Sequence, residues 1–200
     1  LAALDAEVVC LGGAEAMAIK DAMRVSVIAR LIPALGEICL VFAESNVDVV
    51  KRCWGVIGLY TSWVDIGLTT EEQFLRVWFR HCMDERFQLD AVSALERLLH
   101  KGMDSMAKLN LIVQLGLSDA CVDFSFEAPP PFTPKQSFWT VVKSQHPNPR
   151  FSSSDEFQKE AAKFCASLGL ELLECRKLGA LPQIVHLRNQ VRFCLFSFLS

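Results

Sequence analysis

The stretch NVDVVKRCWGVIGLYTSWVDIGLTTEEQF, residues 46–74, decides the fold class, because it carries one helix, a short turn and the start of another helix. Its apolar residues recur at steps of three and four, which is the spacing of one helix face. They are Val49, Val50, Cys53, Val56, Ile57, Tyr60, Trp63 and Val64. Asn46 is a suitable N-cap, and Asp48 lies near the positive end of the helix dipole. The pattern predicts a helix over residues 46–64.

More helices follow at short intervals. Thr70 and Gln73 fit a capping box that starts a helix running to about Met83. The apolar spacing predicts a third helix over about 85–100, for which Gly102 is a candidate left-handed terminator. Asp104 is placed to cap a fourth helix. The sequence thus predicts helices joined by short turns.

The flanking regions are also helical in pattern. Residues 14–44 are predicted to form one long helix or two, because Pro33 must break or kink the helix. Residues 118–154 hold most of the eight prolines, which predicts a loop or insertion with room for one short helix at 135–143. A second capping box, Ser153 to Glu156, starts a helix to about 177, and the chain is helical again from about 181.

Helix pairs therefore recur about every forty residues, the period of HEAT and armadillo arrays. We predict an all-α fold, an α-solenoid of antiparallel helix pairs resembling HEAT repeats. The predicted organisation is helical repeats over 1–117, a loop or insertion over 118–154, and further helices over 155–200, with the chain being an internal piece of a longer protein. A plain helical bundle is the alternative.

Composition restricts the class of protein further. Apolar residues make up 52% of the chain and charged residues 22%, which excludes a mainly disordered chain. The net charge of −3 gives no overall basic signature for nucleic acid. The eight cysteines are scattered, so we interpret them as small buried apolar residues in a reducing compartment. The apolar runs are too short to predict insertion into a membrane, which takes about 20 residues.

The sequence carries no motif for catalysis or for a cofactor. The four histidines form no His-x-x-x-His pair and lie at no zinc-finger spacing from a cysteine. Phosphate-binding loops and the Gly-x-Ser-x-Gly elbow are also missing. We predict no catalytic residue, metal, cofactor or small-molecule substrate, and hence no enzyme.

The basic residues on the second helix of each pair suggest a binding surface. In a helix-pair solenoid the second helices usually line the concave face, where basic side chains could follow a phosphate backbone. The candidate residues for such a nucleic-acid contact are Lys51, Arg52, Arg86, Arg97 and Lys101. Lys51 and Arg52 are adjacent and point about a hundred degrees apart, so they cannot both face one way. The alternative is that all five belong to ordinary solvated helix faces.

Several separate segments resemble the exportin-T family, the tRNA exportins of the karyopherin-β superfamily. They are LDAEVV and IKDAMR near the N-terminus, CWGVIGLYTSWVDIGLTTEEQF at 53–74, LLHKGMDSMAKLNLI at 98–112, and EFQKEAAKFCASLGLELLE at 156–174. The resemblance covers most of residues 1–117 and returns at about 155–177. The loop between Val9 and Ala18 is shorter than in the family, and residues 118–154 have no counterpart there.

The resemblance implies a nuclear export receptor that shuttles between nucleus and cytoplasm. Its expected partners are tRNA, Ran-GTP and nuclear pore proteins, with tRNA and Ran-GTP binding cooperatively and leaving together. The family's SW-[IV]-D turn implies structural roles for Trp63, which would pack between repeats, and for Asp65, which would bind free backbone N–H groups. Gly102 and Asp104 would form the next turn. A protein-cargo karyopherin or a HEAT-repeat scaffold without RNA binding is the alternative.

Overall fold

The computed structural model describes residues 13–62, 64–124, 137–146 and 149–175, and these residues form helices and turns without a strand. Trp63 and the helix predicted from about 181 lie outside them. The helices, in chain order, are α2 (Gly13–Met23), the π-helix η1 (Arg24–Ile28), α3 (Ala29–Val41), α4 (Val47–Thr61), α5 (Ile66–Thr69), α6 (Glu72–Cys82), α7 (Gln88–Leu99), α8 (Ser105–Leu115), α9 (Leu117–Phe124), α10 (Phe138–Gln145) and α11 (Asp155–Cys175).

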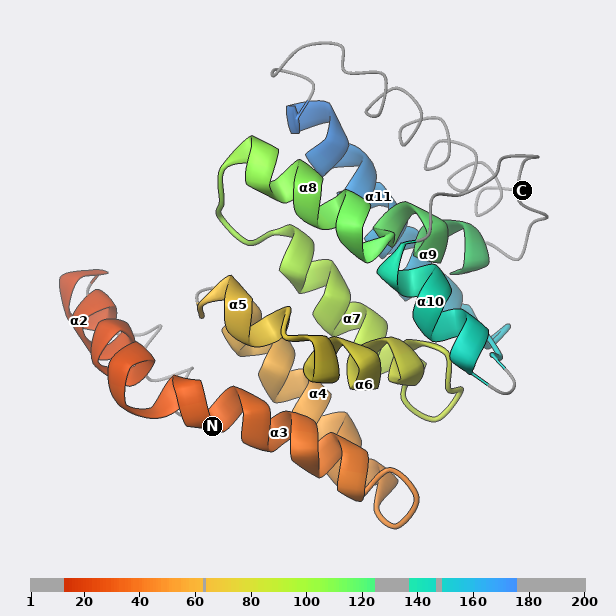
Figure 1. Ribbon diagram of the computed structural model, residues 1–200, viewed down its shortest axis with the longest axis horizontal. Coiled ribbons are helices and arrows are strands. Elements are labelled where there is room, and N and C mark those ends of the chain that lie inside the picture. Colours follow the sequence, from red (N-terminus) through yellow and green to blue (C-terminus); the bar gives the residue numbers. More distant parts are fainter. Residues whose placement is uncertain (1–12, 63, 125–136, 147–148, 176–200) are drawn as a thin grey trace.

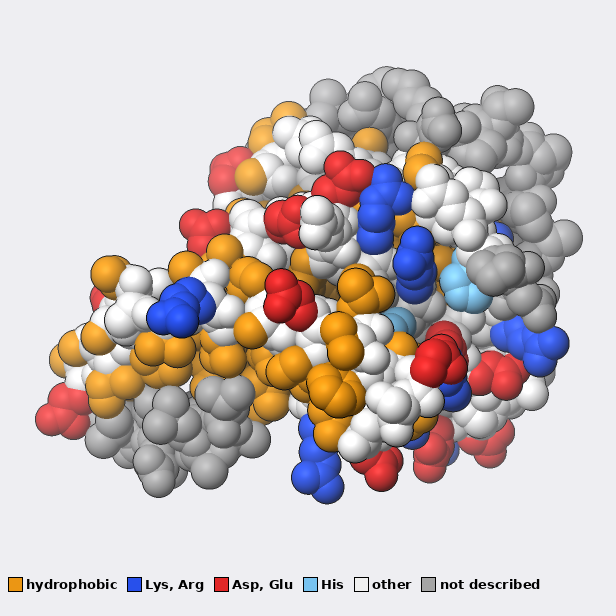
Figure 2. Space-filling model, turned by 60° about the horizontal axis from the view of Figure 1, so that its bottom comes forward, with side chains coloured by type: hydrophobic (Ala, Val, Ile, Leu, Met, Phe, Trp, Pro, Cys, Tyr) orange, Lys and Arg blue, Asp and Glu red, His pale blue; other side chains and the backbone are white. Residues whose placement is uncertain are grey.

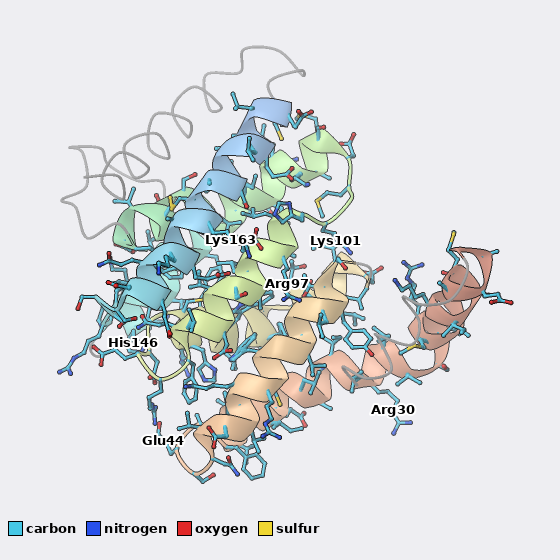
Figure 3. All side chains as sticks on the ribbon, turned by 180° about the vertical axis from the view of Figure 1, so that it is seen from behind. Arg30, Glu44, Arg97, Lys101, His146 and Lys163 are labelled. Carbon is cyan, nitrogen blue, oxygen red and sulfur yellow. A yellow bond between two sulfur atoms is a disulfide. The ribbon has the colours of Figure 1, made fainter. Side chains whose placement is uncertain are left out.

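Antiparallel helix pairs stack side by side to form two layers (Figures 1 and 3). One layer contains α3 and α6, with α10 beside α6. The other layer contains the second helices, α4, α7 and α11, and α8 and α9 pack against α11 and α10. The second helices run in the same direction. Lys51 and Gly58 of α4 lie near Asp90 and Ala94 of α7 in that order. Glu96 and His100, at the end of α7, likewise contact Ser167 and Glu171 of α11 in that order. The predicted all-α fold of stacked antiparallel helix pairs is confirmed.

Helix ends are set by side-chain caps, some of which the sequence identified. Asn46 accepts a hydrogen bond from the N–H of Val49, and Asp104 accepts two at the start of α8, as predicted. The predicted Thr70 cap is wrong. The Thr70 hydroxyl donates to the carbonyl of Ile66 in α5, and Glu71 caps α6 by accepting from the N–H of Phe74.

The left-handed glycine is also not the predicted one. Among the described glycines only Gly116 has positive φ, at 73°, and it ends α8 by donating to two carbonyls of that helix. Gly102 lies in an extended turn between α7 and α8, where the side chain of Asp104 provides the next cap. In the turn between α4 and α5 the carboxylate of Asp65 accepts from the N–H of Gly67 at 2.7 Å.

The N-terminal helices bend one turn before Pro33. Pro33 lies inside α3 instead of ending it, and the backbone widens to the π-helix η1 immediately before α3. Proline lacks the N–H for the usual helical bond and crowds the preceding turn, which a π turn relieves. Figure 1 shows α2 directed away from the two layers beyond this bend, and none of its residues is buried.

Aromatic side chains fill the space between the layers. The fully buried Trp54 of α4 contacts Trp78 of α6 at 5.4 Å between ring centroids. Its indole Nε1 donates to Nδ1 of the buried His81 at 2.8 Å, and the Trp78 indole donates to the carbonyl of Ala91. Both indoles therefore bury their rings without leaving an unpaired N–H group.

The short helix predicted at 135–143 is present as α10, and α9 adds a second helix that the prediction of a loop or insertion over 118–154 did not include. Within this segment α9 and α10 supply core residues, with Phe124 and Trp139 fully buried and in ring contact at 5.5 Å. Trp139 also contacts Phe79 of α6 at 5.1 Å, so α10 continues the layer begun by α3 and α6. The prolines are concentrated at residues 129–134 and 147–149, leaving proline-free stretches on either side that form the two helices.

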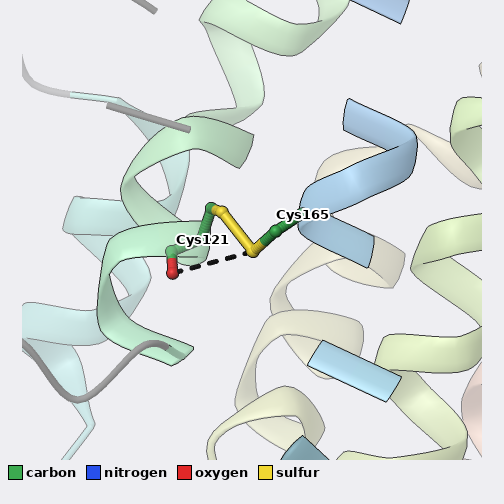
Figure 4. The surroundings of a disulfide bond; sticks show 2 residues. All are labelled: Cys121 and Cys165. Carbon is green, nitrogen blue, oxygen red and sulfur yellow. Dashed lines mark hydrogen bonds between the residues drawn. A yellow bond between two sulfur atoms is a disulfide. The ribbon is translucent and has the colours of Figure 1, made fainter. Parts of the chain in front are cut away.

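The cysteines correspond only partly to the sequence interpretation. Cys39, Cys53, Cys82 and Cys175 are buried free thiols, as expected. Cys121 of α9 and Cys165 of α11 instead form a disulfide, with their Cα atoms 5.7 Å apart (Figure 4). Sequence spacing could not show this pair, because 44 residues separate the two sulfurs along the chain.

Replacing Gly116 with Ala should be strongly destabilising. Its positive φ disfavours a side chain, and an added Cβ would lie 2.2 Å from Ser137 Oγ, so we expect a loss of about 2–4 kcal/mol in unfolding free energy. Gly55→Ala is the matched control. Gly55 is an exposed residue of α4 with no atom within 4 Å of a new Cβ, and the change should stabilise by about 0.5–1 kcal/mol. Urea unfolding measures both, and equal effects would contradict the assignment.

His81 should make stability fall in weak acid. Burial lowers the pKa of His81 to about 4 from the ordinary 6.5, so the folded state holds this ring neutral. The unfolded chain binds the proton first, and stability is therefore lost as the pH falls from 6.5 to 4, by about 3 kcal/mol in total. Unfolding at several pH values should show a flatter profile for His81→Gln, and a profile as steep as that of the original protein would contradict this origin.

Candidate nucleic-acid interface

Three of the predicted basic residues lie on the second helices with their side chains fully or partly exposed to solvent. Lys51 and Arg52 are exposed on α4, and Arg97 is half-buried on α7. None of the three forms an ion pair with another residue of the described chain. Burial raises the pKa of Asp90 on α7, and the charge of Lys51 opposes that shift, so α4 and α7 bring these two groups near each other.

Arg97 is positioned by the close approach of α4 and α7. Its Cδ lies 3.1 Å from the point where a Cβ would stand on Gly58, and the backbone of Ala94 is nearly as close. Any larger residue at 58 would displace the arginine stem or separate the helices. The stem is therefore held against α4 while the guanidinium has no ion-pair partner among the described residues (Figure 3).

Arg86 is placed differently from the prediction. It precedes α7, and its guanidinium bonds the carboxylates of Glu44 and Asp84 at 2.8 Å each, as well as the carbonyl of Ala43. These bonds join the α3–α4 turn to the α6–α7 turn. Hydrogen bonding to Arg86 lowers the pKa of Glu44, which keeps that carboxylate charged. Two acidic partners thus neutralise Arg86, which argues against a contact between its guanidinium and a nucleic acid.

Lys101 is buried, with 8% of its surface exposed, which excludes it as a surface contact. Its ammonium donates to the carbonyls of Thr61 and Val64 at the end of α4. Burial lowers the pKa of Lys101, and the charge of Arg24 adds to that effect. The prediction counted Lys101 among the basic residues on the concave face, but the turn after α7 folds its side chain against α4.

A polar cluster between α7 and α11 contains a basic residue that the candidate set did not include. The carboxylate of Glu96 is 4% exposed and accepts from Ser167 at 2.8 Å and His100 at 2.7 Å, with Lys163 at 3.3 Å. Burial alone would raise the pKa of Glu96, but these hydrogen bonds and the Lys163 charge outweigh it and lower the pKa. Glu96 therefore holds Lys163 and His100 at a surface where about half of each side chain is exposed.

The basic residues are interspersed with acidic ones. Glu96 and Glu160 both pair with Lys163, and Asp90 lies near Lys51. On the face shown in Figure 2, which carries α2 and α3, Lys and Arg side chains are scattered among Asp and Glu, with no continuous basic area. The candidate interface is thus a row of separate cations on the second helices, with Lys51 and Arg52 on α4, Arg97 on α7 and Lys163 on α11.

Other kinds of site find little support in the described part of the chain. It contains no group of three or more His, Cys, Asp or Glu side chains arranged to hold a metal ion. None of its helices combines the length and the apolar composition that a bilayer span requires.

Similarity to known proteins extends over half of the chain. Mouse exportin-T is 31% identical over 103 residues, which is 52% of this chain and 11% of the mouse protein. Human exportin-T is 31% identical over 97 residues, covering 48% and 10%. Exportin-T of Dictyostelium discoideum is 29% identical over 101 residues, covering 50% and 9%. No family model matches the chain.

The resemblance to exportin-T is confirmed. It recurs in vertebrate, fungal and slime-mould exportin-T proteins, at 25–31% identity. The aligned residues span about a tenth of each exportin-T. The chain therefore aligns with one short stretch of these much longer proteins.

Glu96→Gln should destabilise the contact between α7 and α11. The amide cannot serve Ser167, His100 and Lys163 as the buried carboxylate does, and an unsatisfied buried group costs about 1–3 kcal/mol. The pKa of Glu96 is lower in the folded protein than in the unfolded chain. Its contribution to the free energy of unfolding is therefore present at neutral pH and is lost in acid, as the carboxylate becomes protonated. Unfolding of Glu85→Gln, at an exposed carboxylate, is the control. Equal stabilities of the two variants at pH 7 would count against this role.

Proposed function

We propose that the full-length protein is a nuclear export receptor for tRNA, which binds tRNA cooperatively with Ran-GTP and releases both in the cytoplasm. The similarity to exportin-T carries this proposal. The receptor would carry its cargo without chemistry, would contact nuclear pore proteins in transit, and would shuttle between nucleus and cytoplasm.

The proposed contact between this segment and tRNA is electrostatic. Lys51, Arg52 and Arg97 lie on successive second helices without an ion-pair partner in the described chain, so their charges are open to a phosphate backbone. Lys163 would add a fourth cation, reduced in effect by Glu96 and Glu160. With a net charge of −3 over the chain, such local cations are needed for the encounter with RNA.

Cooperation between the two ligands would follow from linkage. If tRNA and Ran-GTP each bind best to the same curvature of the helical stack, each one stabilises the form that the other prefers. Stacked helix pairs suit this mechanism, because small rotations between neighbouring pairs add up along an array.

Titration of the full-length protein with tRNA, with and without Ran-GTP, tests the proposal. We expect tRNA affinity to rise on addition of Ran-GTP, and Ran-GTP affinity to rise by the same factor on addition of tRNA. Ran-GDP is the control and should give no increase. Binding of tRNA that ignores Ran-GTP, or no binding of tRNA, would reject the carrier function.

A protein-cargo karyopherin or a protein scaffold is the second candidate, and one observation favours it. Apolar side chains are exposed along α2, η1 and the end of α3 (Figure 2). They include Met17 at 66%, Val25 at 88% and Val41 at 69% exposure. Such surfaces suit proteins better than RNA. Ran-GTP-dependent binding of a protein cargo without tRNA affinity would support this candidate.

Single substitutions should distinguish the cations without an ion-pair partner in the described chain from Arg86, which has two. In a carrier, Lys51→Ala, Arg52→Ala and Arg97→Ala should each weaken tRNA binding and lessen the slope of log affinity against log salt by about one. Arg86→Ala should leave that slope unchanged, because Glu44 and Asp84 already neutralise the guanidinium. Filter binding between 50 and 200 mM salt measures the slopes. An effect of Arg86→Ala as large as the others would contradict the assignment.

A further inference from the structure

Two buried lysines from one short segment bond the ends of two successive second helices. Lys101 follows α7 and donates to the carbonyl of Thr61, the last residue of α4, and to that of Val64 just beyond it. Lys108 lies one turn into α8 and donates at 2.9 Å to the carbonyl of Leu99, the last residue of α7. Because α4 and α7 run in the same direction, both ends lie at the same side of the layer.

Lys108 also reaches the third second helix. Its ammonium forms an ion pair with Glu171 of α11 at 2.7 Å, and the two side chains are only 11% and 19% exposed. A single ammonium thus contacts α7 and α11, while the ammonium seven residues earlier contacts α4. The segment between them holds the turn Gly102 to Asp104, and Asp104 caps α8.

These contacts have a clear physical basis. The last carbonyls of a helix lack partners within the helix and lie at the negative end of its dipole. Burying an ammonium is unfavourable unless it is hydrogen-bonded, so each lysine is held where such carbonyls are available. A helix that rotated or slid relative to its neighbour would leave both the ammonium and the carbonyls unpaired. The arrangement therefore resists such movement more than an apolar contact does, since apolar contacts are non-directional.

We propose that residues 101–108 act as a clamp, in which Lys101 and Lys108 fix the orientation of α4, α7 and α11 relative to one another. The clamp sets the angle between successive helix pairs, and hence the local curvature of the stack. Given the tRNA carrier function proposed above, on which this consequence rests, the clamp transmits curvature between the tRNA and Ran-GTP sites. Lys101 and Lys108 are positioning residues and touch neither ligand.

The experiment compares full-length protein with Lys101→Met and Lys108→Met, which keep the unbranched stem and remove the ammonium. Hydrogen exchange followed by mass spectrometry reports locally. Peptides from the ends of α4 and α7 should exchange about tenfold faster in Lys101→Met and Lys108→Met respectively. The factor by which Ran-GTP raises tRNA affinity should fall by about fivefold or more, within the usual range of such couplings. Lys159→Met, an exposed lysine on α11, is the matched control and should change neither reading.

Glu171→Gln covers the case in which Lys108→Met does not fold. It keeps the bond from Lys108 to Leu99 and weakens only the link to α11, so the coupling should fall while exchange at the end of α7 stays slow. Unchanged exchange in folded Lys101→Met and Lys108→Met would overturn the clamp. If Ran-GTP raises tRNA affinity by the same factor in the variants as in the wild-type protein, the clamp does not transmit curvature between the two sites, and the carrier function is unaffected. Absence of coupling in the wild type would reject the carrier function, and the exchange data alone would then decide the clamp.

Discussion

The burial of Trp54 between two layers of helices is the constraint on which the rest of the structure depends. Its ring lies against Trp78 and Phe74 of α6, and its N–H group is paired with His81. The same helix presents the small Gly58 to α7, which approaches closely at that point. The large residue sets the distance between layers, and the glycine sets the distance within one layer.

The ends of a helix leave backbone groups without partners inside the helix, whether the end is exposed or buried. Asn46, Glu71 and Asp104 provide carboxylate or amide oxygens for free N–H groups at helix starts. Lys101 and Lys108 provide ammonium groups for free carbonyls at helix ends. Some charged residues of this chain thus stabilise its fold. For this reason the predicted basic residues divide into Arg86 and Lys101, which bond within the chain, and Lys51, Arg52 and Arg97, which form no ion pair in the described chain.

The surface that remains is mixed in character. Lys51, Arg52 and Arg97 leave positive charge on the second helices, while α2 and α3 expose apolar side chains. A receptor for a polyanion and a receptor for a protein would each use one of these features. The similarity to exportin-T favours the first, and the salt dependence of binding distinguishes between the two.

The sequence by itself determined the helices, their order and several of their caps, because a helix face and an N-cap depend on residues three or four apart. The spacing of apolar residues over 46–64 predicts α4, and the residue types at 46 and 104 predict the caps that Asn46 and Asp104 form. The sequence also suggested the exportin-T resemblance through short segments in a fixed order. What it could not provide were pairings between distant residues. Only the tertiary structure decided that Cys121 bonds Cys165, that Arg86 pairs with Glu44, and that Lys101 turns inward. These contacts depend on which helices become neighbours and at what angle, and helical periodicity shows which face a residue lies on without showing what that face meets.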